Sequence, residues 1–421
     1  MRFKVSFATL AAVLALLLGA GQAPATNGDN LIGIGPVSRA MGGVGIASPQ
    51  DTISAVFSNP ATMCFGPHCP SSRFDAAVTL FRPQVDTRVR TGEGEFTASS
   101  EDKIYPIPAA GISAPIGPTG RARFGLAAYG VSGLGVDYRD TDIDSLDTRP
   151  APAGTRRASG TFTDLQRLKA APALAYQITD QLSVGASLHF HRASLDLGNG
   201  KKEGYAIGFQ PGLIYRPIES VSIGATYVSA QEIEHVGVAD FDGDGDRDKL
   251  TLEAPQWFGA GIAWEPLPFE LLFEFNVKWI NWSDAEGYKD FDWNDQWVFN
   301  IGAQYKVSDK WTVRAGYNYA EQVVEEHNGW NGAELVDVQG KMMPRYFYET
   351  FRIVGFPALV EQHVTFGLGY EVKERFHVDI SYMHAFENSL EESGTDIFGA
   401  PAELESSLSE DSLGVALSWI F

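Results

Sequence analysis

The stretch that decides the fold is the C-terminal run of residues 410–421, EDSLGVALSWIF. Large apolar side chains stand at every second position of its last half, at Leu413, Val415, Leu417, Trp419 and Phe421. A period of two, with mostly small or polar residues in between, predicts a β-strand that has two unlike faces. A strand that ends on aromatic residues is typical of transmembrane barrels, which place aromatic side chains at both membrane interfaces.

The same pattern repeats along the chain. We count fourteen alternating segments, at residues 72–85, 104–116, 121–131, 161–177, 181–196, 203–216, 220–231, 249–264, 269–281, 293–305, 310–320, 360–371, 375–387 and 410–421. Tight turns and long connections alternate between them, and short periplasmic turns opposite long outer loops are the asymmetry of bacterial barrels. The sequence therefore predicts an all-β fold, a 14-stranded antiparallel transmembrane β-barrel over residues 71–421.

The bulk composition agrees with a barrel better than with a helical membrane protein. Apolar residues make up 44% of the 421 residues, yet the mean hydropathy is only −0.11. A transmembrane barrel hides its apolar face in alternation and has an ordinary mean hydropathy. The formal net charge of −21 disfavours nucleic acid as a partner.

The N-terminus has the features of an export signal. Arg2 and Lys4 precede a mostly apolar run to about Ala20, and Ala23-Pro24-Ala25 resembles a cleavage site. We therefore expect residues 1–25 to be a signal peptide rather than a membrane anchor helix, for which the run is short. Export to an oxidising compartment favours a disulfide between Cys64 and Cys69, and a metal site that adds His68 is the alternative.

Residues 26–70 are expected to form a plug inside the barrel. The core of this region, residues 33–63, is too rich in glycine for a stable helix of its own and too apolar for a free tail. It closes on Asn59-Pro60-Ala61, where proline and asparagine favour a turn into the first strand.

These features resemble the FadL family of outer-membrane long-chain fatty acid transporters, which includes the TodX-type aromatic hydrocarbon channels. The likeness is carried by Ser38-Arg39-Ala40, Asp51, Asn59-Pro60-Ala61, Pro255-Gln256-Trp257, residues 277–283, residues 314–319 and Phe356-Pro357-Ala358. The resemblance implies a plugged, porin-like monomeric barrel in the bacterial outer membrane, among lipopolysaccharide. It implies passive uptake of long-chain fatty acids or other hydrophobic compounds, such as aromatics or alkanes, and neither an enzyme nor a bound cofactor.

The family mechanism combines movement of the N-terminal hatch with a lateral gap at a kink in the third strand. The residues expected to form and move the hatch are Arg39, Gly42, Gly43, Asp51, Asn59, Pro60 and Ala61. Gly130, Gly133 and Gly135 stand where the kink is expected, although glycines at a strand end also serve plain turns.

A fatty carboxylate favours a cation in the lumen, and alternation points Lys278 and Arg314 inward. The alternative is that both cations pair with the inward acids Glu270 and Glu274, because buried charges are rarely left single. His189 and His191 share an inward face, where they form either a polar wall or a metal pair.

Three further features have alternative interpretations. Asp240, Asp242 and Asp244 resemble the first half of a calcium-binding loop, but the twelfth position, Thr251, lacks the bidentate glutamate. The long loop 321–359 carries aromatic residues that form either an outer collecting patch or a packed loop core. Neither GxSxG nor HExxH occurs, so a barrel lipase or acyltransferase would depend on His363 with Thr365. A non-transporting surface protein, such as an adhesin or receptor with acidic loops, is the other alternative.

Overall fold

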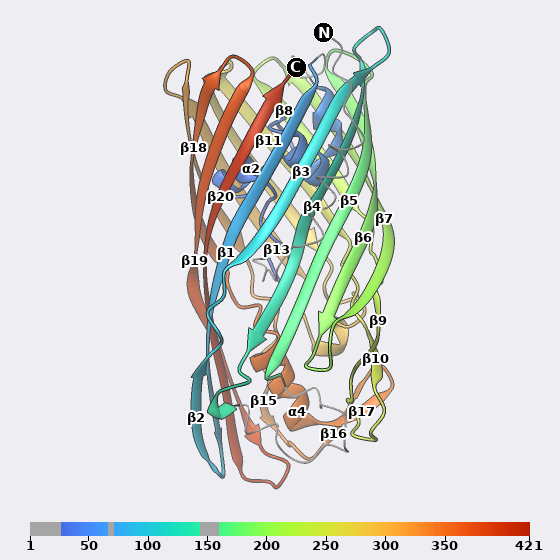
Figure 1. Ribbon diagram of the computed structural model, residues 1–421, viewed down its shortest axis with the longest axis vertical. Helices are drawn as coiled ribbons and strands as arrows, with labels where there is room; N and C mark the ends of the chain where they lie inside the picture. Colours follow the sequence, from blue (N-terminus) through green and yellow to red (C-terminus); the bar gives the residue numbers. More distant parts are fainter. Residues whose placement is uncertain (1–26, 66–70, 144–159) are drawn as a thin grey trace.

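The computed structural model describes residues 27–65, 71–143 and 160–421, and its main feature is one closed barrel (Figure 1). Each neighbouring pair of barrel strands is antiparallel, and the last strand closes the barrel on the first, with Arg73 opposite Ile420. The described residues give fourteen barrel strands, which confirms the predicted number. They are β1 (Arg73–Thr91), β3 (Tyr105–Ile116), β4 (Ala122–Asp137), β5 (Phe162–Gln177), β6 (Leu182–Asp196), β7 (Lys202–Ile218), β8 (Val221–Val228), β11 (Trp257–Leu267), β12 (Leu271–Ile280), β13 (Gln296–Lys306), β14 (Trp311–Ala320), β18 (Gln362–Lys373), β19 (Phe376–Thr395) and β20 (Pro401–Ile420).

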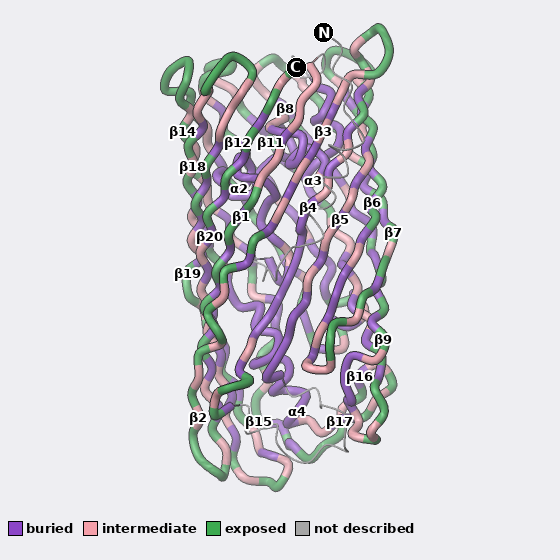
Figure 2. Tube along the Cα trace, in the orientation of Figure 1, coloured by how far each residue is buried: buried purple, intermediate pink, exposed green. Residues whose placement is uncertain are grey.

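The two faces of the wall follow the alternation in the sequence (Figure 2). On β20 the side chains of Leu413, Leu417 and Trp419 are exposed outward, whereas Ala416 and Ser418 are buried inside. An apolar outer band is what the hydrocarbon of a membrane requires, because a charged side chain on the lipid-facing side is destabilising.

The strands extend further on the outer side than the sequence predicts. Residues 388–409, expected to be a loop, lie largely in β19 and β20, and β1 continues into a hairpin with β2 (Gly94–Ser99). Residues 249–264 are not one strand, because β10 (Asp248–Thr251) pairs with β9 (Glu234–Ala239) in a separate hairpin. The alternation continues in these extensions, but polar side chains replace the apolar ones on the outward face.

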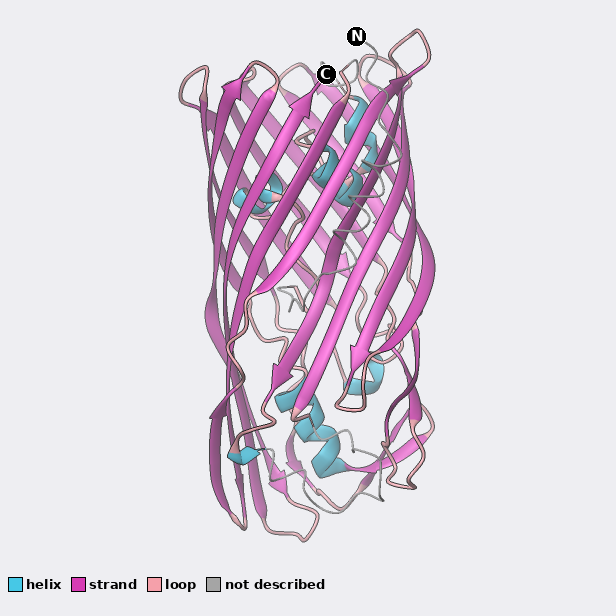
Figure 3. Ribbon diagram, viewed as in Figure 1, coloured by secondary structure: helices cyan, strands magenta, loops and turns pink. Residues whose placement is uncertain are grey.

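The described N-terminal residues 27–65 lie inside the barrel, nearer the end with the short turns (Figures 1 and 3). They form two short helices, α2 (Pro36–Ala40) and α3 (Thr52–Ser58), and a 3-10 helix, η1 (Pro60–Cys64). We call residues 27–65 the inner segment. The predicted signal peptide, residues 1–25, lies outside the described residues. Among the described helices, none has the length and apolarity that crossing a membrane would need.

The outer loops pack into an apolar core at the opposite end. The elements there are η4 (Lys289–Phe291), β15 (Asn328–Trp330), β16 (Leu335–Val338), β17 (Lys341–Pro344), α4 (Arg345–Thr350) and the π-helix η5 (Phe351–Gly355). The aromatic residues of loop 321–359 are buried in this core, namely Trp330, Tyr346, Phe347, Tyr348 and Phe351. These side chains therefore pack the loop on itself and are not an exposed collecting patch.

Candidate functional site

Glycines of the barrel wall make room for the inner segment. A Cβ at Gly224 would lie 2.0 Å from the carbonyl oxygen of Ile46, and one at Gly212 would lie 2.0 Å from Oδ1 of Asn59. Other wall glycines also face the inner segment at distances that exclude a side chain, namely Gly125, Gly185, Gly302, Gly316 and Gly367. At Gly111 and Gly414 the contact is less tight, at 3.1 and 3.2 Å. The backbone of the inner segment therefore lies directly against the wall on most sides of the lumen.

Polar bonds fasten the same segment. Glu274 of β12 accepts hydrogen bonds from the backbone N–H groups of Gly45 and Ala47, at 3.0 and 2.8 Å, and from the hydroxyl of Ser48. Asn59 donates through Nδ2 to the carbonyl oxygens of Ile46, at 2.8 Å, and Leu213, at 3.0 Å. A carboxylate that binds several N–H groups holds a loop firmly, because each such bond is charge-assisted.

The remaining predicted hatch residues are all part of this arrangement. Arg39 is buried and donates to Oγ of Ser412 at 2.7 Å. Burial lowers the pKa of Arg39 to about 10, although the negative charge of Glu410 acts to raise it. Asp51 caps α3 by accepting from the N–H of Ser54 at 2.7 Å. Gly42 and Gly43 have positive φ, and Pro60 and Ala61 begin η1.

The third barrel strand, β4, leaves its neighbour half-way along its length. Its pairing with β3 ends at Tyr129, and its pairing with β5 has a register shift between Gly130 and Ser132. Residues of the inner segment take up the freed edge of β4. Leu31 donates its N–H to the carbonyl of Val131 at 3.1 Å, and Gly133 donates to the carbonyl of Asp29 at 3.2 Å.

The predicted kink glycines therefore lie at this irregularity. Gly130 borders the register shift, Gly133 bonds the inner segment, and Gly135 faces the carbonyl of Thr163 on β5 so closely that a Cβ would lie 2.8 Å from it. A strand edge without a neighbouring strand is a place where a wall can open.

A pocket lies beside this edge, between the inner segment and the wall. Its lining is mainly apolar and aromatic, with Leu31, Phe57, Tyr129, Val131, Trp257 and Ile280 among its residues. Lys169 of β5 and Lys278 of β12 also line it. Nζ of Lys278 lies 5.6 Å from the ring centre of Trp257 and 5.9 Å from that of Phe57. Neither lysine has a hydrogen bond or ion pair with any residue that the structure describes.

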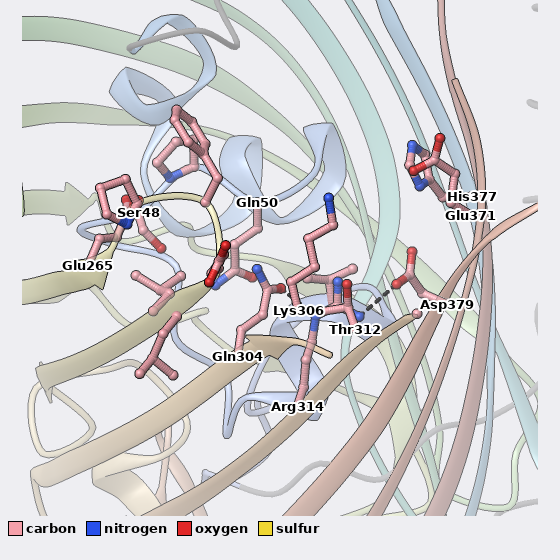
Figure 4. A pocket seen from close by; sticks show the side chains of 18 of the residues that line it. Ser48, Gln50, Glu265, Gln304, Lys306, Thr312, Arg314, Glu371, His377 and Asp379 are labelled. Carbon is pink, nitrogen blue, oxygen red and sulfur yellow. Dashed lines mark hydrogen bonds and ion pairs between the residues drawn. The ribbon is translucent and has the colours of Figure 1, made fainter. Parts of the chain in front are cut away.

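Arg314 does not join Lys278. It forms an ion pair with Asp379 of β19 at 2.7 Å and donates to Oε1 of Gln304 at 2.7 Å (Figure 4). This pair lines a second cavity, of about 600 Å³, at the short-turn end of the barrel. Neither cation forms the alternative pairing with Glu270 and Glu274, because Glu274 binds the inner segment and Glu270 lines this cavity.

The sequence matches a known protein family. The family described as outer membrane protein transport protein (OMPP1/FadL/TodX) matches residues 17–202 and 193–329. The chain belongs to this family. It is accordingly an outer-membrane protein, and the FadL/TodX resemblance of the sequence is confirmed.

Solved structures of the FadL/TodX family have the same fold. The toluene transporter TodX of Pseudomonas putida has a TM-score of 0.65 at 20% identity, covering 92% of this chain and 99% of TodX. A FadL homologue of Pseudomonas aeruginosa has a TM-score of 0.64 at 16% identity, covering 95% and 99%. The toluene transporter TbuX of Ralstonia pickettii has a TM-score of 0.60 at 18% identity, covering 92% and 98%.

One curated relative is similar over a short stretch. It is an uncharacterized protein in the phosphoenolpyruvate carboxykinase gene 5′ region of Chlorobium limicola, 53% identical over 55 residues. The match covers 13% of this FadL/TodX-family chain and only 27% of that relative's length.

The other candidate residues take part in local contacts. His189 contacts Ser187 and Gln210 through Nε2, at 3.0 and 3.2 Å, and His191 contacts Gln231 through Nδ1 at 3.2 Å. These partners make them part of a polar wall. Thr365 donates to the carbonyl of Ala40 at 3.0 Å and accepts from the N–H of Gly42, so its hydroxyl serves the inner segment.

In the acidic loop 240–248, the side-chain amine of Lys341 lies among the carboxylates. Asp240, Asp242 and Asp244 offer oxygens within 4.8 Å of one another. Nζ of Lys341 lies 3.0 Å from Asp242 and 2.7 Å from Asp248. Calcium at this loop stays a prediction. So does the pairing of Cys64, whose sulfur is disulfide-bonded, because Cys69 lies outside the described residues.

Sequence reasoning missed Lys169. The signal was present, since Lys169 stands at an inward position of a strand whose next inward residues are all alanine, Ala171, Ala173 and Ala175. The inward neighbour on its other side, Arg167, carries a like charge, so Lys169 needs a partner of opposite charge from elsewhere.

Proposed function

We propose that this FadL/TodX-family chain carries hydrophobic compounds passively across the outer membrane, and that its substrates include amphiphiles with a carboxylate, such as long-chain fatty acids. The observation that carries the proposal is the pair of buried lysines, Lys169 and Lys278, in one mainly apolar pocket. A buried amine without a hydrogen bond or ion pair is costly, and a ligand carboxylate would supply such a partner.

The pocket lining suits the head end of such a molecule. The cavity is only about 30 Å³, so the rest of the chain would fit only after the inner segment moves. Small-molecule sites are mostly apolar, with a few polar groups that fix the orientation of the ligand. Here the rings of Phe57, Tyr129 and Trp257 provide the apolar surface, and the two amines provide the polar groups. TodX and TbuX are toluene transporters, so an uncharged aromatic compound is the substrate against which a fatty acid must be compared.

The route out of the pocket is proposed to pass the free edge of β4. Val131 belongs both to this edge and to the pocket, and Asn30 and Leu31 cover the edge from inside. Displacement of these residues would open the pocket sideways, toward the membrane. Such opening needs no energy source, because the free energy of an apolar molecule falls when it passes from water into hydrocarbon.

Uptake of oleate and of toluene, in cells that lack their own transporters, tests the proposal. The intact chain is expected to raise oleate uptake. Lys278→Met and Lys169→Met should each lower the oleate rate about tenfold, the effect of losing one charge-assisted hydrogen bond, and leave any toluene uptake unchanged. Lys310→Met is the matched control, since it removes an exposed lysine at the short-turn end.

Two results would count against the proposal. If both lysine variants take up oleate at the rate of the intact chain, at equal surface expression, then Lys169 and Lys278 do not bind a substrate carboxylate. If the intact chain takes up neither compound, the chain transports neither oleate nor toluene, and the surface-protein alternative is favoured.

A further inference from the structure

Asp29 connects three parts of the molecule that are far apart in the sequence. Its buried carboxylate accepts, at Oδ2, a hydrogen bond from Nη1 of Arg167 on β5 at 2.9 Å. The same oxygen accepts the hydroxyl of Tyr288, which lies in the outer loop between β12 and β13. One carboxylate oxygen of the inner segment is therefore shared between the wall and an outer loop.

The backbone around Asp29 closes the free edge of β4. The carbonyl of Asp29 accepts from the N–H of Gly133, the N–H of Leu31 donates to Val131, and Asn30 forms a bridge with Ser132. Ser132, directly under this bridge, is 3% exposed. The side chain of Asp29 thus holds the outer loop while its backbone covers the edge.

Aromatic packing fixes the outer partner of Asp29. The ring centre of Tyr288 lies 4.6 Å from those of both Trp282 and Trp293. Gly28 lies against the same group, with φ of +64°, and a Cβ there would be 2.6 Å from the ring of Trp282. The outer loop and the inner segment are therefore in direct contact at Gly28 and Trp282.

We propose that Tyr288, through Asp29, is a positioning residue that keeps the β4 edge covered while the outer loop is closed. This rests on the proposed function, in which the β4 edge is the lateral exit. A hydrophobic compound that enters among Trp282, Tyr288 and Trp293 from outside would withdraw the hydroxyl of Tyr288 from Asp29. Asp29 would keep only Arg167, and the inner segment would uncover β4.

Labelling of a cysteine at Ser132 tests this without any transported compound. The parent is the full exported chain carrying Ser132→Cys, in lipid vesicles, and the probe is a small maleimide. Tyr288→Phe keeps the ring but removes the hydroxyl from Asp29. It should raise the labelling rate about tenfold, because one bond to a buried charge is lost. The chain without Ser132→Cys measures background.

Tyr348→Phe is the matched control. Tyr348 is a buried tyrosine of the same outer core, and its hydroxyl donates to Asp292 at 2.7 Å, with no contact to Asp29. It should leave labelling at the parent rate. The proposal is overturned if Tyr288→Phe labels at the parent rate, or if both tyrosine variants raise labelling equally. Since no substrate is involved, failure of this test leaves the uptake experiment to decide the proposed function.

Discussion

Asn59 shows how much one side chain contributes to the position of the inner segment. Its amide nitrogen binds two carbonyls, one of the inner segment and one of β7, and its Oδ1 accepts from the N–H of Ala61 at 3.1 Å. Gly212 leaves the space into which that oxygen fits. The turn predicted from Asn59-Pro60 is thus also an attachment to the barrel wall.

Asp51 gives a prediction at the same scale. Burial, and after it the charge of Asp75, raise the pKa of Asp51 to about 6, while Arg73 and the bonds to Ser54 act in the opposite direction. A carboxyl with a raised pKa favours the folded segment at low pH and loses that contribution as the pH rises from about 4 to 6. Asp51→Asn keeps the helix cap but removes the charge.

At pH 7 the amides of α3 should therefore exchange several-fold more slowly in the variant than in the parent. At pH 4 the two proteins should exchange alike. Measurement on the full chain in detergent checks this. Faster exchange of the variant at both pH values would mean that the ionised carboxylate stabilises the helix, contrary to the prediction.

Single residues also mark where sequence reasoning stopped. Alternation placed Lys278 and Arg314 on the inner face, but it does not tell which strand supplies a partner. Arg314 reaches Asp379 across β18, over Gly369, where a Cβ would lie 2.6 Å from the carboxylate and 2.9 Å from the guanidinium. Only the missing side chain of Gly369 makes that pairing possible, and no pattern within one strand reveals it.

At the scale of elements, the backbone of the inner segment packs directly against glycines of the wall strands. The strand pattern predicts the strands well because lipid on one side and a polar lumen on the other impose a strict period of two. It fails beyond the membrane. There, β20 still buries Ala402, Leu404 and Leu408, but Glu403 and Glu405 face outward, so the pattern has no membrane signature.

Gly224→Ala tests the contact between the wall and the inner segment. The new methyl group would collide with the carbonyl of Ile46. The barrel should still form, seen as heat-sensitive mobility on gels, but residues 45–48 should be displaced and become accessible to protease. Ala225→Val adds bulk to the lipid-facing side of the same strand and should not change cleavage. Equal cleavage of both variants and the parent would contradict the tight fit.

At the scale of the whole molecule, the barrel carries a separate folded core at its outer end. A buried charge network holds this core, in which Arg352 lies 2.5 Å from Glu349 and 3.2 Å from Glu392. His327 contacts Glu349 at 3.0 Å. Burial opposes ionisation of Glu349, but His327 and Arg352 together lower its pKa.

Arg352→Met should unfold this outer core and spare the barrel. It leaves buried Glu392 without its cation and Glu349 with only Arg345 and His327, a loss of about 3–5 kcal/mol in such networks. Protease added to intact cells should cut loop 321–359 in the variant, while the barrel keeps its heat-sensitive mobility. Arg345→Met removes a partly exposed arginine that also contacts Glu349, at 2.9 Å, and should have little effect. Equal cutting in the two variants would argue against the special role of Arg352.

The unequal strand lengths have a consequence for the surroundings of the protein. β19 and β20 have 20 residues each, and β12 has 10. At about 3.3 Å per residue and a tilt of about 40°, these lengths correspond to heights of roughly 50 and 25 Å, against an apolar band of about 25 Å. On the side of β19 and β20 the sheet therefore extends beyond the membrane into the sugar layer of the cell surface. Neighbouring proteins meet a tall face on that side and a low one on the other, so the molecule has a front and a back in the plane of the membrane.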